Sequence, residues 1–502
     1  MAVWNYLESL IPQLILLAFA LVLPAVDYLL KNKKILSVVA LAPLFAVAGL
    51  VVLWLFFDAW TPVNTMTHVL ELNTFSGLLI LVFVSVGIVV VLSSPEFIKK
   101  DRNHGEYYSL ILLAVTGMTV VAEGNDLFML FVGLEISGIA SFALSGFRKS
   151  EKRSAEAATK YFIIGGFSSA ITLFAISIVY GVAGTTEISA LGTALSGSFS
   201  SIDGSETYLL LGVVLFMAGL GFKIAMVPFH MWAPDVYEGA PTPISGFLAA
   251  ASKKMGFAAL FKIFLVGVLV TKGNWEVAVG VLAILTMTVG NLIAVSQTNI
   301  KRMLAYSSIA QAGYILIALP VGTQYAVAGG LFHILTHAFM KSGAFMVVAA
   351  LGAVAVGERL EDFKGLSRRS PFLAFSMTIF LLSLAGIPPL AGFASKFVIF
   401  SSAVYPAVGA GPGPEWLIWL AVAGVLNSAL SLYYYARVIK YMYMDKGPTE
   451  RIRPTPMIAF AIVIALVMVI ALGVFPDTVI NLCKEAGALF PLPLGTPSPI
   501  IA

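Results

Sequence analysis

Five ionisable residues lie inside long apolar stretches of this sequence, where a charge is expensive unless it has a partner or a function. They are Glu135, Lys223, Lys253, Lys254 and Lys396. An ionised side chain at the centre of a bilayer costs at least ~2.5–3.5 kcal/mol on insertion scales, and such residues usually face the interior of a helix bundle. There they mark pathways for ions or protons. The first hypothesis is therefore a membrane protein that moves charge.

Glu135 and Lys223 are the natural pair among these residues, because each would lower the cost of burying the other. A change in their separation would alter how tightly the lysine holds its proton. Lysine suits this chemistry, since a desolvated ammonium group loads and releases a proton readily. Lys253 and Lys254 are adjacent, so they point about 100° apart on a helix, and at most one of them is expected to face a polar axis.

A second group of candidates follows one stripe of an apolar helix. His333, His337 and Lys341 are spaced at i, i+4 and i+8, which places them on the same face. The spacing also suits a metal, but no acidic or cysteine ligand accompanies it, so a proton relay is the preferred interpretation and a packed, hydrogen-bonded histidine the alternative. His230, in a turn-like segment, is equally well read as structural or functional. Lys262 stands nearer a helix end, where we expect its amine to reach the membrane surface.

The composition identifies the class of protein. Of the 502 residues, 59% are hydrophobic and only 11% are charged, whereas soluble domains have about 25% charged residues. The apolar runs are continuous over ~20 residues, which fits membrane-spanning helices and not the shorter alternating strands of a barrel. The single cysteine, Cys483, excludes a cysteine-ligated iron–sulfur cluster and an internal disulfide. We therefore expect an all-α polytopic membrane protein with no cofactor or metal of its own.

About fourteen apolar segments of spanning length can be marked along the chain. Their approximate limits are 11–30, 36–57, 74–94, 107–122, 126–147, 160–181, 208–232, 242–270, 275–296, 303–320, 324–353, 371–402, 415–440 and 455–475. No basic region precedes the first segment, so it is read as a retained helix and not as a signal peptide.

The basic residues test this division independently, because Lys and Arg collect in cytoplasmic loops. Of the 30 basic residues, 22 fall in the odd-numbered loops, and only Lys272 and Lys484 fall in the even-numbered loops and the tail. The other six lie within the proposed helices: Lys223, Lys253, Lys254, Lys262, Lys341 and Lys396. This distribution places both termini on the outer face of a membrane, which we expect to be the inner membrane of a prokaryotic cell.

Two of the charged segments contain helix-breaking prolines close to the charge. Pro228 follows Lys223, and Pro388 and Pro389 precede Lys396. Proline kinks a helix, and the freed carbonyls are tolerated in a membrane where they are buried in protein or line a watery cavity. Transporters built from inverted repeats carry broken helices in corresponding positions of their halves. Helices 7 and 12 are five helices apart, which predicts two inverted five-helix units made of helices 4–8 and 9–13.

This interpretation divides the chain into four parts. They are a three-helix segment over 1–106, a first unit over 107–270, a second unit over 271–440, and a carboxy-terminal helix and tail over 441–502. The longest outer loop, 181–206, is expected to be a connector without a domain of its own. The loop 232–241 carries Asp235 and Glu238 but no basic residue, and two readings stay open: it attracts protons, or it caps the next helix.

Three strings resemble the antiporter-like proton-pumping subunits of respiratory complex I and its relatives. They are GFKIAMVPFHMWAPDVYEGAPTPISGFLAAASKKMGF, NIKRMLAYSSIAQAGY and LAGIPPLAGFASKF, and the likeness extends over roughly helices 4–13. Within the family the sequence is most similar to subunit N of NADH-quinone oxidoreductase, the counterpart of mitochondrial subunit 2, since a lysine and not a glutamate occupies the helix 12 position. His333 and His337 depart from this pattern and are more similar to subunit M and to antiporter complexes.

The resemblance implies roles for individual residues. Glu135 would be the glutamate of helix 5 and Lys223 its partner on helix 7. Lys253 matches the central lysine of helix 8 and Lys396 the terminal lysine of helix 12, while Lys254 has no assigned counterpart. Electron transfer in partner subunits would then drive protons between these groups. The chain would be a proton-translocating part of an enzyme complex, without a redox centre of its own.

The implied partners are other membrane subunits, peripheral redox subunits reached through the complex, and the lipid bilayer, with no nucleic acid. The electron donor stays open between NADH, F420H2, ferredoxin and a hydrogenase module, as does a quinone or phenazine acceptor. Two other functions are kept. One is a subunit of a multi-subunit Na+/H+ antiporter, which needs no electron donor, or of a membrane-bound hydrogenase. The other is a passive scaffold whose buried charges only tie helices together.

Overall fold

A computed structural model describes residues 10–30, 32–57, 68–99, 101–199, 204–408 and 414–495. Lys31 and Lys100, which contribute to the predicted basic loops, lie outside these residues. Within the described ranges the regular secondary structure is helical, and strand-type pairing is limited to isolated β-bridges. The predicted all-α class is therefore confirmed.

Twelve helices in the described part of the chain are long and apolar enough to cross a membrane. They are α2 (Ile11–Leu29), α3 (Lys34–Phe57), α4 (Thr74–Ser93), α5 (His104–Glu123), α6 (Leu127–Ser145), α7 (Lys152–Ala183), α9 (Ser205–Ile224), α13 (Lys272–Ser296), α14 (Ile300–Leu316), α16 (Gln324–Gly352), α20 (Ile418–Tyr443) and α21 (Pro456–Val474). The span of α14 is completed by the short α15 (Ala318–Val321).

Two further predicted spans are interrupted, so the total of fourteen crossings stays a prediction. The span expected over 242–270 is divided into α11 (Thr242–Phe247), a π-helical turn at Leu248–Ser252, α12 (Lys253–Lys262) and a second π-helical turn at Ile263–Gly267. The span expected over 371–402 is divided into α18 (Pro371–Ala385) and α19 (Ala391–Ala407). A π-helical turn is rare and is frequently found at functional sites, which directs attention to both ends of α12.

The chain breaks at both places that the prolines predict. Within the span expected over 208–232, α9 ends at Ile224, and α10 (Trp232–Gly239) starts after a separate loop. Ala225 follows α9 with a φ of 56°, and Gly386 follows α18 with a φ of 90°. Both values lie in the left-handed region, which commonly terminates a helix.

The same hydrogen bond closes both broken helices. The N–H of Met226 donates to the carbonyl of Gly221 at 2.8 Å, and the N–H of Ile387 donates to the carbonyl of Leu382 at 3.1 Å. A six-to-one bond of this kind, next to a left-handed residue, is the Schellman closure. Each break also contains one cis peptide bond before a proline.

α6 and α14 begin alike, although they belong to different predicted units. Asp126 caps α6 and Asn299 caps α14, and each side chain accepts hydrogen bonds from two backbone N–H groups of its helix. A distant segment then joins each start through an isolated β-bridge, Glu187 with Asp126 and Arg359 with Asn299. Such agreement at two distant places is what a repeated unit would produce, and the division into two units stays a prediction.

Both of these helices cross the preceding helix at a glycine. A Cβ atom on Gly117 of α5 would lie 2.5 Å from the backbone nitrogen of Ser137 on α6. One on Gly290 of α13 would lie 2.6 Å from the backbone nitrogen of Ala310 on α14. Small residues let the backbones of membrane helices approach this closely.

Two segments that were expected to be irregular contain helices. The connector 181–206 contains α8 (Ile188–Phe199), and the carboxy-terminal tail contains α22 (Asp477–Ala488). α22 buries a face that includes Cys483, and it packs against α16 and α4. A search for apolar runs of spanning length misses both helices, because each has only 12 residues.

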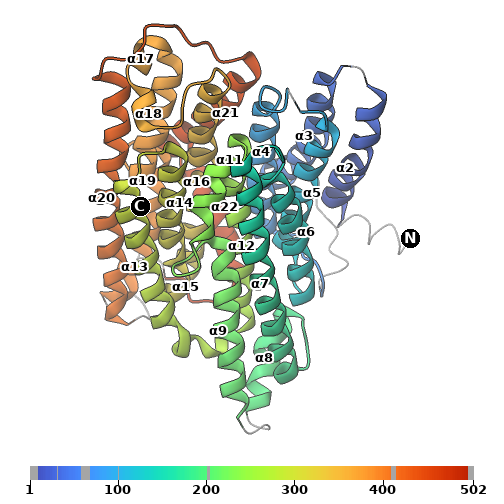
Figure 1. The fold of residues 1–502 in the computed structure, drawn as a ribbon. Coiled ribbons are helices and arrows are strands. Elements are labelled where there is room, and N and C mark those ends of the chain that lie inside the picture. Colours follow the sequence, from blue (N-terminus) through green and yellow to red (C-terminus); the bar gives the residue numbers. More distant parts are fainter. Residues whose placement is uncertain are drawn as a thin grey trace.

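The buried charges lie around two central helices. The spans of α14 and α16 are buried over the whole of their most apolar 18-residue stretch. Figure 1 shows α2 and α3 on one side of the molecule and α20 on the opposite side, with α8 at one end and α17 (Leu366–Arg369) at the other. The fold therefore surrounds α14 and α16 with other helices.

A single methyl group at the α5–α6 crossing should destabilise the protein. Gly117→Ala places a Cβ against the backbone of α6, and we expect a loss of about 1–3 kcal/mol, as for other overpacked cores. Gly166→Ala is the matched control, because a Cβ there meets no atom within 4 Å. Thermal unfolding in detergent measures both variants. Equal midpoints for the two would contradict the close crossing.

Candidate functional site

Glu135 and Lys223 lie near each other but are not directly bonded. Glu135, on α6, is half-buried and accepts a hydrogen bond from the hydroxyl of Ser169 on α7. Lys223, at the last turn of α9, is 5% exposed. Its ammonium lies 3.4 Å from the carbonyl oxygen of Leu134 and 5.7 Å from the ring centre of Phe142, and Glu135 acts on it electrostatically. The two groups thus interact electrostatically without forming an ion pair.

Two glycines make the space that Lys223 occupies. A Cβ on Gly138 of α6 would lie 2.8 Å from the ammonium nitrogen of Lys223, and a Cβ on Gly256 of α12 would lie 3.2 Å from the Cβ of Lys223. Lys223 therefore fills the gap between α6 and α12. Through Gly256 it lies beside the helix that begins with Lys253.

Lys253 is fully buried directly after a π-helical turn, and its ammonium has no hydrogen-bond partner among the described residues. The ring centre of Tyr237 on α10 lies 5.3 Å from the ammonium nitrogen. Lys254 is also buried, at 1% exposure. Both lysines act electrostatically on His337 and Lys341 of α16. The expectation that at most one of them faces a polar axis stays a prediction.

The two histidines of α16 have different surroundings. Both are fully buried. The ring of His333 makes two hydrogen bonds of 2.9 Å, to Ser395 on α19 and to Gln311 on α14. His337, one turn further on, has no partner for either ring nitrogen among the described residues. His333 is therefore a packed histidine with both ring nitrogens hydrogen-bonded. His337 makes no such bonds, and the lysines around it act on it electrostatically.

Lys341 completes the predicted stripe on α16, and its ammonium makes two hydrogen bonds. Its ammonium donates to the carbonyl of Leu304 at 2.9 Å and to the hydroxyl of Ser307 at 2.8 Å. Ser307 is in turn hydrogen-bonded to Tyr435 on α20. The stripe therefore connects α16 with α14 and α20 through side chains.

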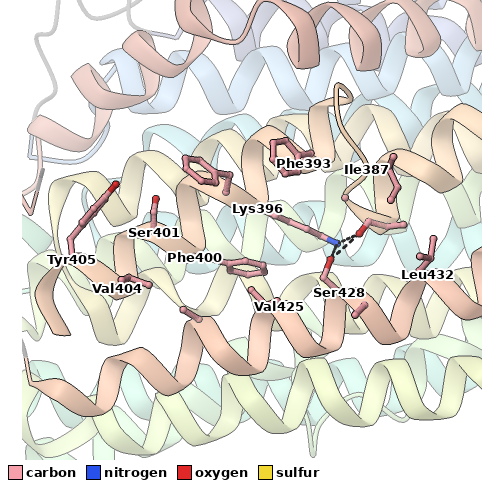
Figure 2. A pocket seen from close by; sticks show the side chains of 15 residues that line it. Ile387, Phe393, Lys396, Phe400, Ser401, Val404, Tyr405, Val425, Ser428 and Leu432 are labelled. Atoms are coloured by element: carbon pink, nitrogen blue, oxygen red, sulfur yellow. Dashed lines mark hydrogen bonds between the residues drawn. The ribbon is translucent and has the colours of Figure 1, made fainter. Parts of the chain in front are cut away.

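Lys396 sits at the broken end of α18. Its ammonium donates to the carbonyls of Leu384 and Ala385 at 2.8 and 3.2 Å and to the hydroxyl of Ser428 at 2.8 Å, as Figure 2 shows for part of this set. The carboxy-terminal carbonyls of a helix carry partial negative charge, so a cation is stabilised there. The ring of Tyr314 adds a contact at 4.9 Å. The break in the helix thus provides the acceptors that a buried ammonium needs.

A cavity of about 560 Å³ lies beside Lys396, between α19 and α20 (Figure 2). Most of its wall is apolar, and the exposed rings of Phe393 and Phe397 line it. Lys396 and Ser428 are the polar groups that meet at its inner side. The lysine at this end of the site is therefore buried by protein on one side and close to the lateral surface on the other.

One amide connects the histidine to this lysine, and the sequence analysis missed it. The amide oxygen of Gln311 accepts a hydrogen bond from Nε2 of His333, and its amide nitrogen donates to the carbonyl of Leu384 at 3.1 Å. The same carbonyl accepts from Lys396. Like the lysines, Gln311 is a polar residue inside an apolar helix, so a search that included amides would have found it.

The predicted residue His230 lies in the loop between α9 and α10. It is 7% exposed, and its Nδ1 atom has no partner among the described residues. Lys253 is the charged group that acts on it. His230 therefore lies close enough to interact with Lys253, and its predicted role in a proton relay stays a prediction.

We call the buried residues Lys223, Lys253, Lys254, Gln311, His333, His337, Lys341 and Lys396 the central network.

The acidic segment 232–241, which was expected to be a loop, consists largely of the helix α10, and its carboxylates form ion pairs. Asp235 binds Lys160 at 2.8 Å and Arg302 at 2.7 Å, and Arg302 also binds Glu238 at 3.1 Å. Burial would raise the pKa of Asp235, but the hydrogen bonds from Lys160 and Arg302 outweigh it, and the pKa is lower than usual. These pairs join α7, α10 and α14 at one end of the bundle.

Within the described ranges, no group of three or more His, Cys, Asp or Glu residues could hold a metal ion. The expectation of a chain without metal or cofactor stays a prediction. The chemistry that the described site supports is proton binding by lysine, histidine and glutamate side chains.

The chain belongs to a family of membrane proteins described as NADH:quinone oxidoreductase/Mrp antiporter, transmembrane, whose model matches residues 124–430. This range includes all nine predicted site residues and the family resemblance is confirmed. Together with the twelve apolar helices it makes the chain an integral, multi-pass membrane protein.

Two relatives cover almost the whole chain. The F(420)H(2) dehydrogenase subunit N of Methanosarcina mazei is 42% identical over 497 residues, covering 95% of this chain and 97% of the relative. The NADH-quinone oxidoreductase subunit N of Trichlorobacter lovleyi is 39% identical over 490 residues, with 96% of each chain covered. The predicted similarity to N subunits is therefore confirmed.

Solved structures agree with this assignment. A chain of respiratory complex I from Thermus thermophilus matches with a TM-score of 0.75 and 30% identity, covering 94% of this chain and 99% of that one. A chain of the archaeal membrane-bound sulfane sulfur reductase matches with a TM-score of 0.83 and 28% identity, with 96% and 97% covered. A chain of the Mrp complex from Dietzia shares the fold at a TM-score of 0.82, with 22% identity.

The ion pairs of Asp235 should stabilise the protein in a pH-dependent way. Because its pKa is lowered on folding, the stabilisation is present above the unfolded pKa of about 3.9 and is lost as the pH falls through the lower, folded value. Asp235→Asn should cost about 1 kcal/mol at pH 7, a modest value because the pair is partly exposed.

Thermal unfolding of the two proteins between pH 7 and pH 3 measures this difference. The gap in stability should narrow towards the acidic end of the range. Glu156→Gln is the control, since Glu156 also binds Lys160 but is 64% exposed, and it should change stability by less than about 0.5 kcal/mol. A gap that is constant with pH would show that Asp235 does not act through its charge.

Proposed function

We propose that this chain is a proton-translocating membrane subunit of a redox-driven complex of the complex I type, in which partner subunits carry out electron transfer. The observation that carries the proposal is the buried, unpartnered pair of groups at its centre, the ammonium of Lys253 and the ring of His337. Buried polar groups are normally hydrogen-bonded, and an exception calls for a functional explanation. Groups that bind and release protons are such an explanation.

The surroundings of the central network support a path between its two ends. Lys223 lies against α12 near Lys253, and Lys253 and Lys254 act on His337 and Lys341. His333 and Gln311 then lead to the carbonyl that Lys396 binds. Protons would pass along these groups through intervening water, since the direct bonds do not form a continuous chain.

Glu135 would set the state of this path from one end. It is half-buried on α6 and interacts electrostatically with Lys223 without an ion pair. A small shift of α6 against α9 would bring the charges together or apart, and this changes which groups hold protons. The proposal assigns proton translocation to Glu135, Lys223, Lys253 and Lys396, with a supporting relay of His230, Lys254, His333, His337 and Lys341.

The proposal includes orientation and assembly. The chain would lie in a prokaryotic inner membrane with both termini outside, since the predicted inner loops hold most basic residues. It would be built from two inverted units over 107–270 and 271–440, which the matching helix starts and breaks support. As in the complexes named for its relatives, the partners would be other membrane subunits and, through them, redox subunits.

The scaffold alternative fits only part of the network. Lys341 and Lys396 each donate to backbone carbonyls and hydroxyls, as residues that tie helices together would. Lys253 and His337 have no such bonds among the described residues. A residue that only holds helices together would be expected to make the contacts that these two lack, so the observation favours proton transfer.

Replacing the two charged groups at the Glu135 end tests the function. We expect Lys223→Met and Glu135→Gln to lower the number of protons moved per electron in the complex purified with this chain and reconstituted in vesicles. A missing proton-transfer group costs ~10²–10⁴-fold in rate, so pumping should fall at least tenfold. A pH-sensitive dye inside the vesicles, read beside reductant oxidation, gives the ratio.

Lys484→Met is the matched control, because Lys484 is an exposed lysine on α22. It should pump like the unchanged complex. Wild-type proton-to-electron ratios in both Lys223→Met and Glu135→Gln would refute the proposal. Assembly defects in these variants, with normal ratios in the complexes that do form, would favour the scaffold.

A further inference from the structure

A second ionisable cluster lies outside the central network, at the end of the bundle that carries α8. The segment before α4 pairs there with the end of α5 through a β-bridge between Leu70 and Gly124. The N–H of Glu71 donates to the carbonyl of Glu123 at 2.8 Å, so the two glutamates stand opposite each other. Glu71 is half-buried and Glu123 is completely buried.

The carboxyl group of Glu123 makes no hydrogen bond of good geometry with any described residue. The side chain of Gln13 on α2 lies against it, but both amide atoms of Gln13 also lack a partner. A fully buried carboxyl without partners is rare, because the loss of hydration is not compensated. Neither the family motif nor the search for isolated charges singled out Glu123, which stands at the end of an apolar helix.

The positive charge of this cluster is Lys262. Its ammonium donates to the carbonyls of Ala122 and Gly124 at 2.6 and 2.9 Å, and both glutamates act on it electrostatically. The side chain is only 9% exposed, and the expectation that its amine reaches the membrane surface stays a prediction. Within the protein it is held by the carboxy-terminal carbonyls of α5, where a cation is stabilised.

The charges of these three residues do not balance if both glutamates are ionised. Two carboxylates and one ammonium leave a net negative charge in a largely buried site, and two neighbouring carboxylates disfavour each other's ionised form. One bound proton restores neutrality. Glu123 is the natural holder, because it is fully buried and unbonded, whereas Glu71 has access to solvent.

The helix α12 connects the cluster to the central network. It begins at Lys253 and ends at Lys262, and a π-helical turn adjoins each of these lysines. Lys254, Ala258 and Lys262 follow one stripe at i, i+4 and i+8, which spans about 12 Å of the helix. The small Ala258 is the only residue of this stripe between the two lysines.

From this arrangement we propose that Glu71, Lys262 and Glu123 form a proton-binding cluster that exchanges protons between the central network and the solution at the α8 end. Glu123 holds the proton, Lys262 tunes its affinity by its charge, and Glu71 passes it to water. The role rests on the proposed function, because it makes the cluster one terminus of the same proton path. It also gives a use to Lys254, which has no counterpart in the family motif.

Glu123→Gln in the reconstituted complex tests the cluster. The amide has the shape of the acid but cannot release a proton, so we expect proton pumping to fall at least tenfold. In pH-difference infrared spectra, the variant should also lack one band of a protonated carboxylic acid. Glu276→Gln is the matched control, since Glu276 pairs with Lys272 in the outer part of α13, and it should keep both the pumping and the band.

The outcomes separate this inference from the proposed function. Normal pumping in Glu123→Gln, together with lost pumping in Lys223→Met, overturns the cluster and leaves the proposed function standing. Normal pumping in both variants overturns both. A lost band with lost pumping in Glu123→Gln, and neither loss in Glu276→Gln, supports the cluster.

Glu71→Gln keeps the inference testable if Glu123→Gln does not assemble. Glu71 is half-buried, so its replacement disturbs packing less. Removal of a neighbouring negative charge makes the remaining carboxyl ionise more readily, and the infrared band should titrate at a pH lower by at least ~0.5 units. An unchanged titration midpoint would overturn the cluster.

Discussion

The cost of burying ammonium groups is the constraint on which this structure depends. A lysine inside a membrane protein must find acceptors or lose its charge. Lys396 and Lys262 find them at the carboxy-terminal ends of α18 and α5, where helix carbonyls are free. Lys341 uses a carbonyl and a hydroxyl of α14. Lys253 has none of these among the described residues, and this difference separates lysines that are held by acceptors from one whose ammonium has no acceptor.

The irregular backbone follows from the same constraint. A continuous α18–α19 helix would use the carbonyls of Leu384 and Ala385 internally, and Lys396 could not be satisfied where it lies. The break frees them, and the left-handed Gly386 turns the chain away. The equivalent break after α9 has the same closure, yet Lys223 there precedes the break and reaches across to α6. Two breaks with the same closure thus lie beside lysines that find their acceptors in different places.

The sequence predicted the features that depend on local composition, such as the spans and the helix breaks. It did not predict the features that depend on contacts between helices. Apolar length identified most spans, and prolines beside charges located both breaks. The π-helical turns around α12 leave no mark in apolar periodicity, and α8 and α22 are too short to register as spans. The sequence also did not indicate that Lys253 and Lys254 both act electrostatically on side chains of α16. Gln311 was missed because only charges and histidines were searched.

The proposed proton path depends most directly on the space between the ammonium of Lys253 and the ring of His337. If these groups exchange protons, water must bridge them, because no described side chain does so. An electron cryomicroscopy map of the assembled complex, at a resolution that shows ordered water, tests this directly. We expect ordered water within hydrogen-bond distance of the Lys253 ammonium and of a His337 ring nitrogen. These water molecules should form a continuous chain between the two groups. A dry, apolar contact with no water at either group would contradict it.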